Sequence, residues 1–176
     1  MRLVLVRHTA VADGQGLCYG RTDVDLADSF PADAQAVRAA LPAGPWALYA
    51  SPARRCRRLA DWLGGTAIID ARLHELDFGA WEGRAWNDLP RPELDRWCAD
   101  FVTVRPPGGE SFAELTARAV AFAADAASRH AGGCVVALTH AGFIRALLAS
   151  RRGVPCADVF SIAVPLGSVH ILEPAG

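Results

Sequence analysis

Lysine is absent from this 176-residue sequence, so all 18 of its strongly basic residues are arginine. The acidic residues nearly balance them, and the formal net charge is −1 with histidine neutral. A charge this close to zero gives no electrostatic sign of nucleic-acid binding or of attachment to an anionic membrane. The absence of lysine is typical of a compositional bias in the genome, but it also means that any bound anion must be held by planar guanidinium groups.

Cysteine is scarce, and the five cysteines include no C-x-x-C pair. An odd count without that spacing argues against a disulfide framework and against a zinc site, and reduced thiols fit the cytosol. No apolar stretch approaches the ~20 residues of a membrane span, and the apolar run after Met1 is too short for the core of a signal peptide. We therefore expect a cytoplasmic protein that does not enter a membrane.

Short apolar runs alternate with helical patterns along the chain. Buried β-branched runs predict strands over Leu3–Val6, Trp46–Ala50, Thr66–Ile69 and Cys134–Leu138, and apolar stretches over Val159–Val164 and Val169–Leu172 close the chain. Helices are expected over Pro31–Leu41, from Ser51-Pro52 to about Leu63, over Glu93–Phe101, from Ser111 to the Gly132-Gly133 pair, and after His140 to Ser150. This alternation over one stretch, 1–176, predicts a single domain of the α/β class, with helices flanking a mostly parallel central sheet.

Three local signals refine this picture. The segment between residues 9 and 30 is a long loop with scattered glycines, and loops of this length in compact domains are usually functional. Ser111 and Glu114 have the spacing of a capping box, which begins a helix with one apolar stripe at Phe112, Leu115, Ala119, Phe122 and Ala126. In the helix after Ser51, Leu59 and Trp62 follow Arg55 by four and seven residues, so we expect that stripe to face the core and Arg55 to point inward.

Polar residues follow three of the expected strands directly. They are Arg7-His8, the run Ser51–Arg55 and Thr139-His140. Ligands of parallel α/β sheets bind beyond the carboxyl ends of the strands, so these residues are expected to share one crevice. A single histidine at a strand end more often holds a backbone carbonyl, but an adjacent guanidinium needs an anionic partner.

Two histidines and two inward arginines predict a phosphate pocket. One histidine can attack phosphorus while the other holds an equatorial oxygen. Glu75 and Glu82 lie in the loop HELDFGAWEG, and either is a candidate for the general acid that protonates the leaving oxygen. The alternative for each glutamate is an ordinary surface carboxylate.

Six blocks of sequence, in order from residue 7 to residue 145, resemble the signature segments of the histidine phosphatases and cofactor-dependent phosphoglycerate mutases. Arg7-His8-Thr9 resembles their Arg-His-Gly signature, and Gly20 to Leu26 resembles G-x-x-D-x-x-L. Four further blocks match family segments: Ser51 to Cys56 (S-P-x-x-R-[AC]), Leu73 to Gly83 (L-x-E-x-x-x-G-x-x-E-G), Pro107 to Ser111 (P-G-G-E-S) and Thr139 to Arg145 ([ST]-H-x-G-x-[IL]-R).

The resemblance implies a phosphoglycerate mutase-like three-layer sandwich and a phosphoric monoester hydrolase. It implies that His8 is the phosphorylated nucleophile, that Arg7, Arg55 and His140 bind the phosphoryl group, and that Glu75 rather than Glu82 is the proton donor. It implies that the enzyme uses neither a metal nor an organic cofactor. It also implies that the partner is a small-molecule phosphate ester.

Two positions depart from the family pattern. Thr9 replaces a commoner glycine and adds a hydroxyl near the phosphate, and Gly14 replaces a frequent asparagine and removes a phosphate contact. The chain also lacks the longer inserts of the mutases, so a mutase-like enzyme is less expected than a phosphatase.

The run Gly16 to Arg21 resembles that of the α-ribazole-phosphate phosphatases of cobalamin biosynthesis. The resemblance implies that Tyr19 and Arg21 of this chain stack on or bridge to a ribose-linked base, and the alternative is that they only shape the loop. The alternatives are a broad-specificity phosphatase and a catalytically silent regulatory protein that binds a phosphate ligand. No G-x-G-x-x-G follows Val6 and no G-x-S-x-G occurs, which disfavours a dinucleotide-binding oxidoreductase and a serine hydrolase. The oligomeric state stays open.

Overall fold

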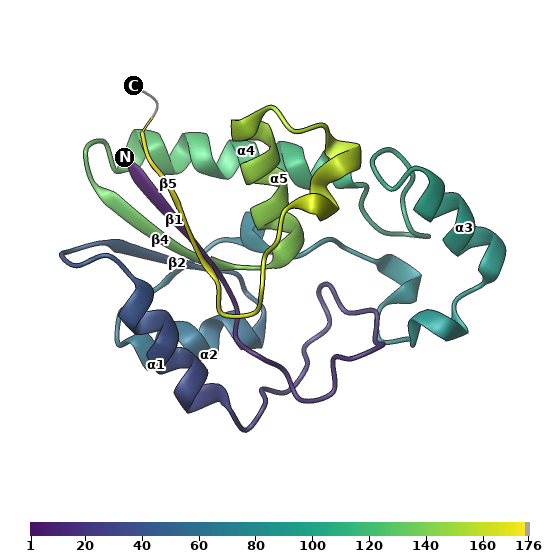
Figure 1. Ribbon diagram of the computed structural model, residues 1–176, viewed down its shortest axis with the longest axis horizontal. Coiled ribbons are helices and arrows are strands. Elements are labelled where there is room, and N and C mark those ends of the chain that lie inside the picture. The colour runs from purple at the N-terminus through teal and green to yellow at the C-terminus, as the bar shows by residue number, and fades with distance from the viewer. Residues whose placement is uncertain (175–176) are drawn as a thin grey trace.

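A five-stranded sheet with helices on both faces forms the centre of the computed structural model, which describes residues 1–174 (Figure 1). The strands are β1 Arg2–Arg7, β2 Ala47–Ala50, β3 Ile68–Ile69, β4 Cys134–Thr139 and β5 Val169–Leu172. They lie in the order β3-β2-β4-β1-β5. The first four strands are parallel, and β5 runs antiparallel to β1 at one edge. The predicted α/β class and the mostly parallel sheet are confirmed.

Five α-helices complete the layers: α1 Phe30–Ala40, α2 Arg54–Leu63, α3 Arg91–Ala99, α4 Phe112–Arg129 and α5 Ala141–Arg152. Figure 1 shows α1 and α2 on one face of the sheet, α4 and α5 on the other, and α3 beyond its end. Short 3₁₀ helices lie at Ala71–Leu73, Gly79–Trp81, Trp86–Asp88 and Cys156–Ser161. The expected three-layer sandwich is therefore present.

Strand β1 shows how the sequence divides the core. Its side chains alternate between faces, so Leu3 and Leu5 pack with α4 and α5, whereas Val4 and Val6 pack with α1 and α2. All four are buried, which explains why the strand is a continuous apolar run rather than an alternating one. The predicted stripe on α4 is also buried at all five positions, and both hydrogen bonds of the Ser111–Glu114 capping box are formed.

The prediction for α2 is wrong in two respects. The helix begins at Arg54 after an Ala53 N-cap, not at Ser51-Pro52, because the Ser51 hydroxyl bonds to His140 instead of capping the helix. The buried stripe is Cys56, Leu59, Ala60 and Leu63, while Trp62 is 39% exposed. Arg55 is nevertheless buried, as expected.

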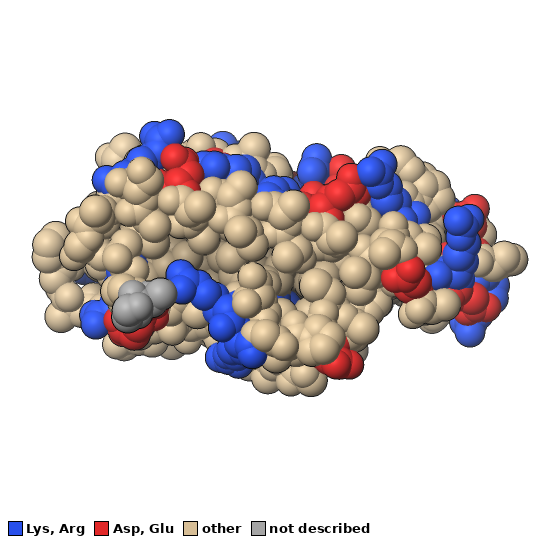
Figure 2. Space-filling view, turned by 90° about the horizontal axis from the view of Figure 1, so that it is seen from above, with Lys and Arg blue, Asp and Glu red and all other residues tan. Residues whose placement is uncertain are grey.

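Other boundaries differ by a few residues. The structure narrows the expected strands near 46–50 and 66–69, shifts the expected helix Glu93–Phe101 to α3, and extends the last helix to Arg152. The stretch Val159–Val164 begins within a 3₁₀ helix. On the face shown in Figure 2, basic and acidic side chains both appear with uncharged surface between them. Among residues 1–174, no helix combines the length and apolar character needed to cross a membrane.

Candidate active site

The carboxyl ends of β1, β2 and β4 meet at one edge of the sheet. Arg7 is paired with Thr139, and Ala50 with Leu138, so the residues that follow these strands emerge side by side. The rings of His8 and His140 lie edge to face with their centroids 5.3 Å apart. The structure therefore brings together the three strand-end clusters that the sequence predicted.

His8 is 2% exposed, and its hydrogen bond fixes the tautomer of its ring. Its Nδ1 lies 2.8 Å from the backbone carbonyl oxygen of Thr9. Because a carbonyl only accepts, Nδ1 carries the proton, and the lone pair of the neutral ring is on Nε2. Burial, reinforced by the charge of Arg55, lowers the pKa of His8 to about 3. The imidazole is thus neutral over the physiological pH range, with a free lone pair on Nε2.

The guanidinium of Arg55 is fully buried beside both histidines. Nη1 donates to the carbonyl of Thr22 at 2.9 Å, and Nη2 donates to that of Gly20 at 2.6 Å. Nη2 also lies 3.1 Å from His140 Nδ1. A guanidinium has no acceptor, so Nδ1 of His140 must accept this bond. Arg55 thereby joins the long loop to the second histidine.

His140 is held from both sides. With Nδ1 accepting from Arg55, the proton of the neutral ring is on Nε2, which donates to Ser51 Oγ at 2.8 Å. Burial and the nearby Arg55 charge lower the pKa of His140 well below its usual value. Both ring nitrogens are therefore engaged, and His140 can contact a phosphoryl oxygen only by exchanging one of these bonds.

Arg7 and Thr9 flank His8 and carry unsatisfied polar atoms. Arg7 donates from Nη1 to the carbonyl of Val164 at 2.6 Å and lines the same cavity as His8. Within residues 1–174, Arg7 Nε, Thr9 Oγ1 and Arg55 Nε are buried without a hydrogen-bond partner. An unpaired buried polar group costs about 1–3 kcal/mol, and native proteins rarely carry several together outside functional sites.

Arg7, His8 and Arg55 line a cavity of about 220 Å³, whereas His140 and Thr9 are buried behind its wall. Five of its lining residues were expected from the sequence: Arg7, His8, Tyr19, Arg55 and Glu75. The other five are Leu17, Phe78, Trp86, Ala141 and Arg145. Within the described part of the chain, histidine, cysteine and carboxylate side chains do not gather in any group of three or more suited to a metal ion.

Glu75 lies at the N-terminus of α5, on the cavity wall. The backbone N–H of Gly142 donates to both of its carboxylate oxygens, at 3.0 and 3.1 Å. A Cβ atom on Gly142 would lie only 2.3 Å from Glu75 Oε1, which explains why glycine occupies this position of the Thr139–Arg145 block. The predicted proton donor therefore lines the same cavity as the predicted nucleophile.

Arg118 on α4 holds the segment that carries Glu75. Its Nη1 donates to the carbonyls of Arg72 and His74, both at 2.6 Å, and its Nη2 donates to the carbonyl of Glu75 at 3.0 Å. Nε and Nη2 bind the two carboxylate oxygens of Glu110 at 2.7 and 2.9 Å. All five N–H donors of the guanidinium are used, so this pair fixes the backbone at Glu75.

Tyr19 lies in the cavity wall, whereas Arg21 does not. The guanidinium carbon of Arg55 is 5.3 Å from the centroid of the Tyr19 ring. Gly14 permits this arrangement, because a Cβ there would lie 2.9 Å from Tyr19 Cε1. Arg21 instead forms a half-exposed ion pair with Asp77 at 3.0 Å, so the structure does not bring it together with the other candidates.

Glu82 anchors the loop that supports Arg55. Its carboxylate accepts from the backbone N–H groups of Gly20, Arg21, Thr22 and Phe78 and from the Thr22 hydroxyl. Burial alone would raise the pKa of Glu82, but the bonds from Thr22, Arg21 and Gly20 outweigh it and hold the pKa below the usual value. Both oxygens of the Glu82 carboxylate thus accept hydrogen bonds from the backbone and from Thr22, an arrangement that favours a structural role over proton transfer.

The roles of two site residues were not recognised from the sequence. Arg145 belongs to the same block as His140, and its side chain lines the cavity while Nε donates to the carbonyl of Ile162 at 3.1 Å. Ser51 belongs to the run Ser51–Arg55 that was expected in the crevice, but its hydroxyl was interpreted as a helix cap, whereas it bonds to His140. For Arg145 the available signal was its spacing of one helical turn from Gly142.

Residues 3–176 match the model of the histidine phosphatase superfamily, branch 1. The chain belongs to this superfamily. It is 26% identical to phosphoserine phosphatase 1 of Hydrogenobacter thermophilus, over 98% of this chain and 86% of the relative. Among solved structures it is similar to YhfR of Bacillus stearothermophilus, with 27% identity, a TM-score of 0.86, and 99% and 92% of the two chains covered.

A second similar structure is the alpha-ribazole phosphatase of Shigella flexneri, with 25% identity, a TM-score of 0.88, and 98% and 90% of the two chains covered. The family and the names of its relatives identify this protein as a phosphatase. The relatives named phosphoserine, glucosyl-3-phosphoglycerate and alpha-ribazole phosphatases differ in substrate, so the family alone does not select an ester.

The two adjacent arginines at the start of α2 give a direct test of the geometry. Arg55→Lys should weaken competitive inhibition by inorganic phosphate roughly 10- to 100-fold, because lysine cannot span Gly20, Thr22 and His140 with a single ammonium. Arg54→Ala should change the inhibition constant less than about twofold, since Arg54 forms an exposed ion pair with Asp25. The opposite ranking of the two variants would show that the guanidinium of Arg55 is not part of the phosphate site.

Proposed function

We propose that this phosphatase hydrolyses phosphate monoesters through a phosphohistidine formed on Nε2 of His8. The observation that carries the proposal is the bond from His8 Nδ1 to the Thr9 carbonyl, which leaves the Nε2 lone pair free in a cavity lined by Arg7 and Arg55. Two guanidinium groups beside a neutral imidazole suit a dianionic ester, because they neutralise the charge that otherwise repels a nucleophile.

The reaction has two balanced steps. Nε2 attacks phosphorus in line, the bond from phosphorus to the alcohol oxygen breaks, and Glu75 gives its proton to that oxygen. Water then attacks the phosphohistidine, the nitrogen–phosphorus bond breaks, and Glu75 takes the proton of the water. Arg7, Arg55 and His140 hold the phosphoryl oxygens, and Thr9 aids them through its backbone and hydroxyl. Neither step needs a metal or an organic cofactor.

For the substrate we favour α-ribazole 5′-phosphate, an ester of cobalamin biosynthesis. The support is the resemblance of Gly16 to Arg21 to the phosphatases of that ester, the similarity to the Shigella flexneri structure, and the Tyr19 ring in the cavity wall. An aromatic ring at this position can stack on a planar base. Phosphoserine is the competing substrate, because a relative of similar length carries that name.

Replacement of the nucleophile tests the mechanism. His8→Ala should lower turnover by on the order of 10³-fold or more, the scale seen when a catalytic nucleophile is removed. Rapid quenching of the wild type with a labelled ester should trap an acid-labile, base-stable phosphoryl group, absent from the variant. His130→Ala, at the end of α4 and outside the cavity, is the matched control and should keep its activity. Near-normal turnover in His8→Ala would refute the mechanism.

The two loop glutamates are separated by leaving-group chemistry. If Glu75 is the acid, Glu75→Gln should slow hydrolysis of a nucleoside-like 5′-phosphate by roughly 10²-fold or more, because a ribose hydroxyl is a poor leaving group. The same variant should slow p-nitrophenyl phosphate much less, since nitrophenolate leaves without protonation. Glu82→Gln should affect both esters alike or mainly lower stability. A leaving-group effect confined to Glu82→Gln would reassign the acid, and its absence from both variants would point to His140 or water.

The substrate is tested by a direct comparison of two esters. The value of kcat/KM for α-ribazole 5′-phosphate should exceed that for O-phosphoserine at least tenfold, because stacking of a base on an aromatic side chain is worth about 1–3 kcal/mol. Hydrolysis of p-nitrophenyl phosphate serves as the reference for active enzyme. If phosphoserine is the better substrate, the protein belongs with the relatives of that name.

A further inference from the structure

A second, larger cavity adjoins the phosphate cavity. Its volume is about 290 Å³, and its lining includes Glu75, Phe78, Trp86 and Arg145, which also line the phosphate cavity. The two cavities are therefore adjacent and share these four residues. We call the second one the aromatic chamber, after its remaining lining residues Leu76, Trp97, Phe101, Phe112, Gly142 and Phe160.

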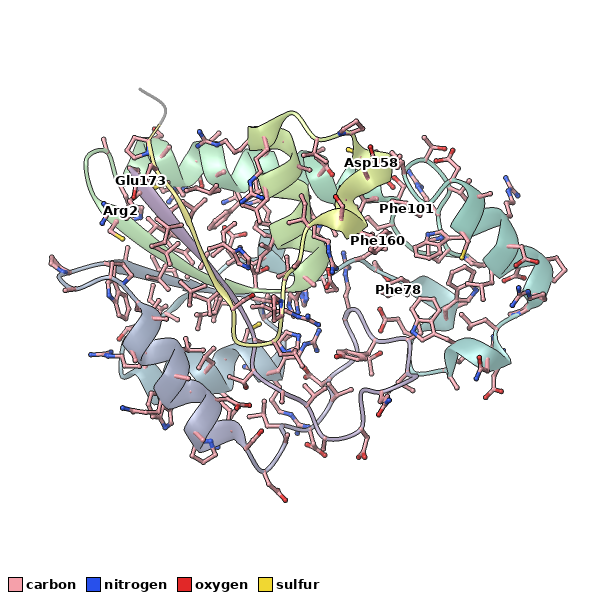
Figure 3. All side chains as sticks on the ribbon, in the orientation of Figure 1. Arg2, Phe78, Phe101, Asp158, Phe160 and Glu173 are labelled. Atoms are coloured by element: carbon pink, nitrogen blue, oxygen red, sulfur yellow. The ribbon has the colours of Figure 1, made fainter. Side chains whose placement is uncertain are left out.

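The chamber is built from separate parts of the chain. Phe78 and Trp86 come from the irregular segment before α3, Trp97 from α3, and Phe160 from the 3₁₀ helix Cys156–Ser161. Figure 3 shows Phe78, Phe101 and Phe160 gathered where the sheet and its flanking helices meet the segment 78–101. We call this segment, which includes α3, the arm that carries α3. Six aromatic rings line the chamber, and its charged residues, Glu75 and Arg145, lie at the junction with the phosphate cavity.

Ring-to-ring contacts hold the wall in place. Phe78 meets Trp86 with centroids 5.4 Å apart, and Phe101 meets Phe112 at 5.6 Å and Phe160 at 5.0 Å. The Arg145 guanidinium lies 5.4 Å from the centroid of Phe160. Such mutually packed rings form a pocket before a ligand arrives, so binding loses little conformational entropy.

We infer that the aromatic chamber binds the alcohol part of the ester and selects alcohols that carry an uncharged planar ring. When the phosphoryl group occupies the adjoining cavity, the alcohol lies near Glu75 and Arg145, which line both cavities. The chamber is the apolar space next to these two residues. An apolar cavity of roughly 150 Å³ is enough for benzene, so the chamber has room for a fused bicyclic ring. A charged group beyond the junction would lose its hydration without gaining a partner.

This inference rests on the proposed function for the position of the ester, but binding alone tests it. The probes are 2-phenylethylphosphonate and butylphosphonate, which cannot be hydrolysed and differ in the ring. Titration calorimetry on the wild type should show about tenfold tighter binding of the phenyl compound, or about 1.4 kcal/mol. The matching esters, whose alcohols are equally poor leaving groups, should show the same preference in kcat/KM.

Substitutions in the wall of the aromatic chamber test whether the phenyl ring of the ligand binds there. Phe160→Ala removes a ring that is 61% exposed and contributes little to the core, and Phe101→Leu keeps apolar volume without a ring. Each should reduce the phenyl preference about threefold or more while butylphosphonate binds as before. Trp62→Ala, which removes an exposed aromatic side chain from α2, is the control and should leave the preference unchanged.

Equal affinities of the two phosphonates for the wild type, or a phenyl preference that survives both wall variants, would overturn the inference. Phenyl preference in binding without hydrolysis of any ester would support the chamber and refute the proposed function. Hydrolysis of the esters without a phenyl preference would support the proposed function and refute the role of the chamber.

Discussion

The burial of the Arg55 guanidinium is the constraint on which the site depends. A buried charge that lacks partners costs several kcal/mol, so the chain must bring acceptors to it. It does so with two carbonyls of the long loop and with the ring of His140. The loop, the start of α2 and the end of β4 are thereby fixed around one planar cation. The tautomer of His140 follows from the same set of bonds, whereas that of His8 follows from the bond between its Nδ1 and the Thr9 carbonyl.

The irregular segments around the sheet are ordered by charged side chains bonded to backbone. The Glu82 carboxylate accepts hydrogen bonds from the backbone N–H groups of residues 20–22. The Arg118 guanidinium donates to backbone carbonyls within the segment 72–75. Each supplies the hydrogen bonds that a regular ladder would otherwise provide. Gly20 and Gly109 allow the segments to approach closely, since a Cβ would lie 1.8 Å from the Leu76 carbonyl oxygen and 2.4 Å from that of Asp77.

Sequence patterns predicted the layers and the grouping of polar residues at the strand ends but not the aromatic chamber. Continuous apolar runs mark β1 and β4, and the stripe of α4 has one clear period, so local sequence determines them. The predicted start of α2 was wrong because serine is a common N-cap residue, whereas the Ser51 hydroxyl here bonds to His140. The ion pair of Arg21 with Asp77 could not be predicted because it joins two distant segments. The aromatic chamber joins rings from separate segments, which no local periodicity links.

Two tryptophans of that chamber, together with the neighbouring Trp81, also give the molecule an optical property. Trp81, Trp86 and Trp97 lie with centroids 5.9 to 6.5 Å apart, close enough for their electronic transitions to couple. Near-ultraviolet circular dichroism responds to fixed aromatic packing, whereas the far-ultraviolet signal reports the helices and the sheet. The arm that carries α3 therefore has its own spectroscopic signature, and its loss of order during heating can be followed separately from the unfolding of the sheet.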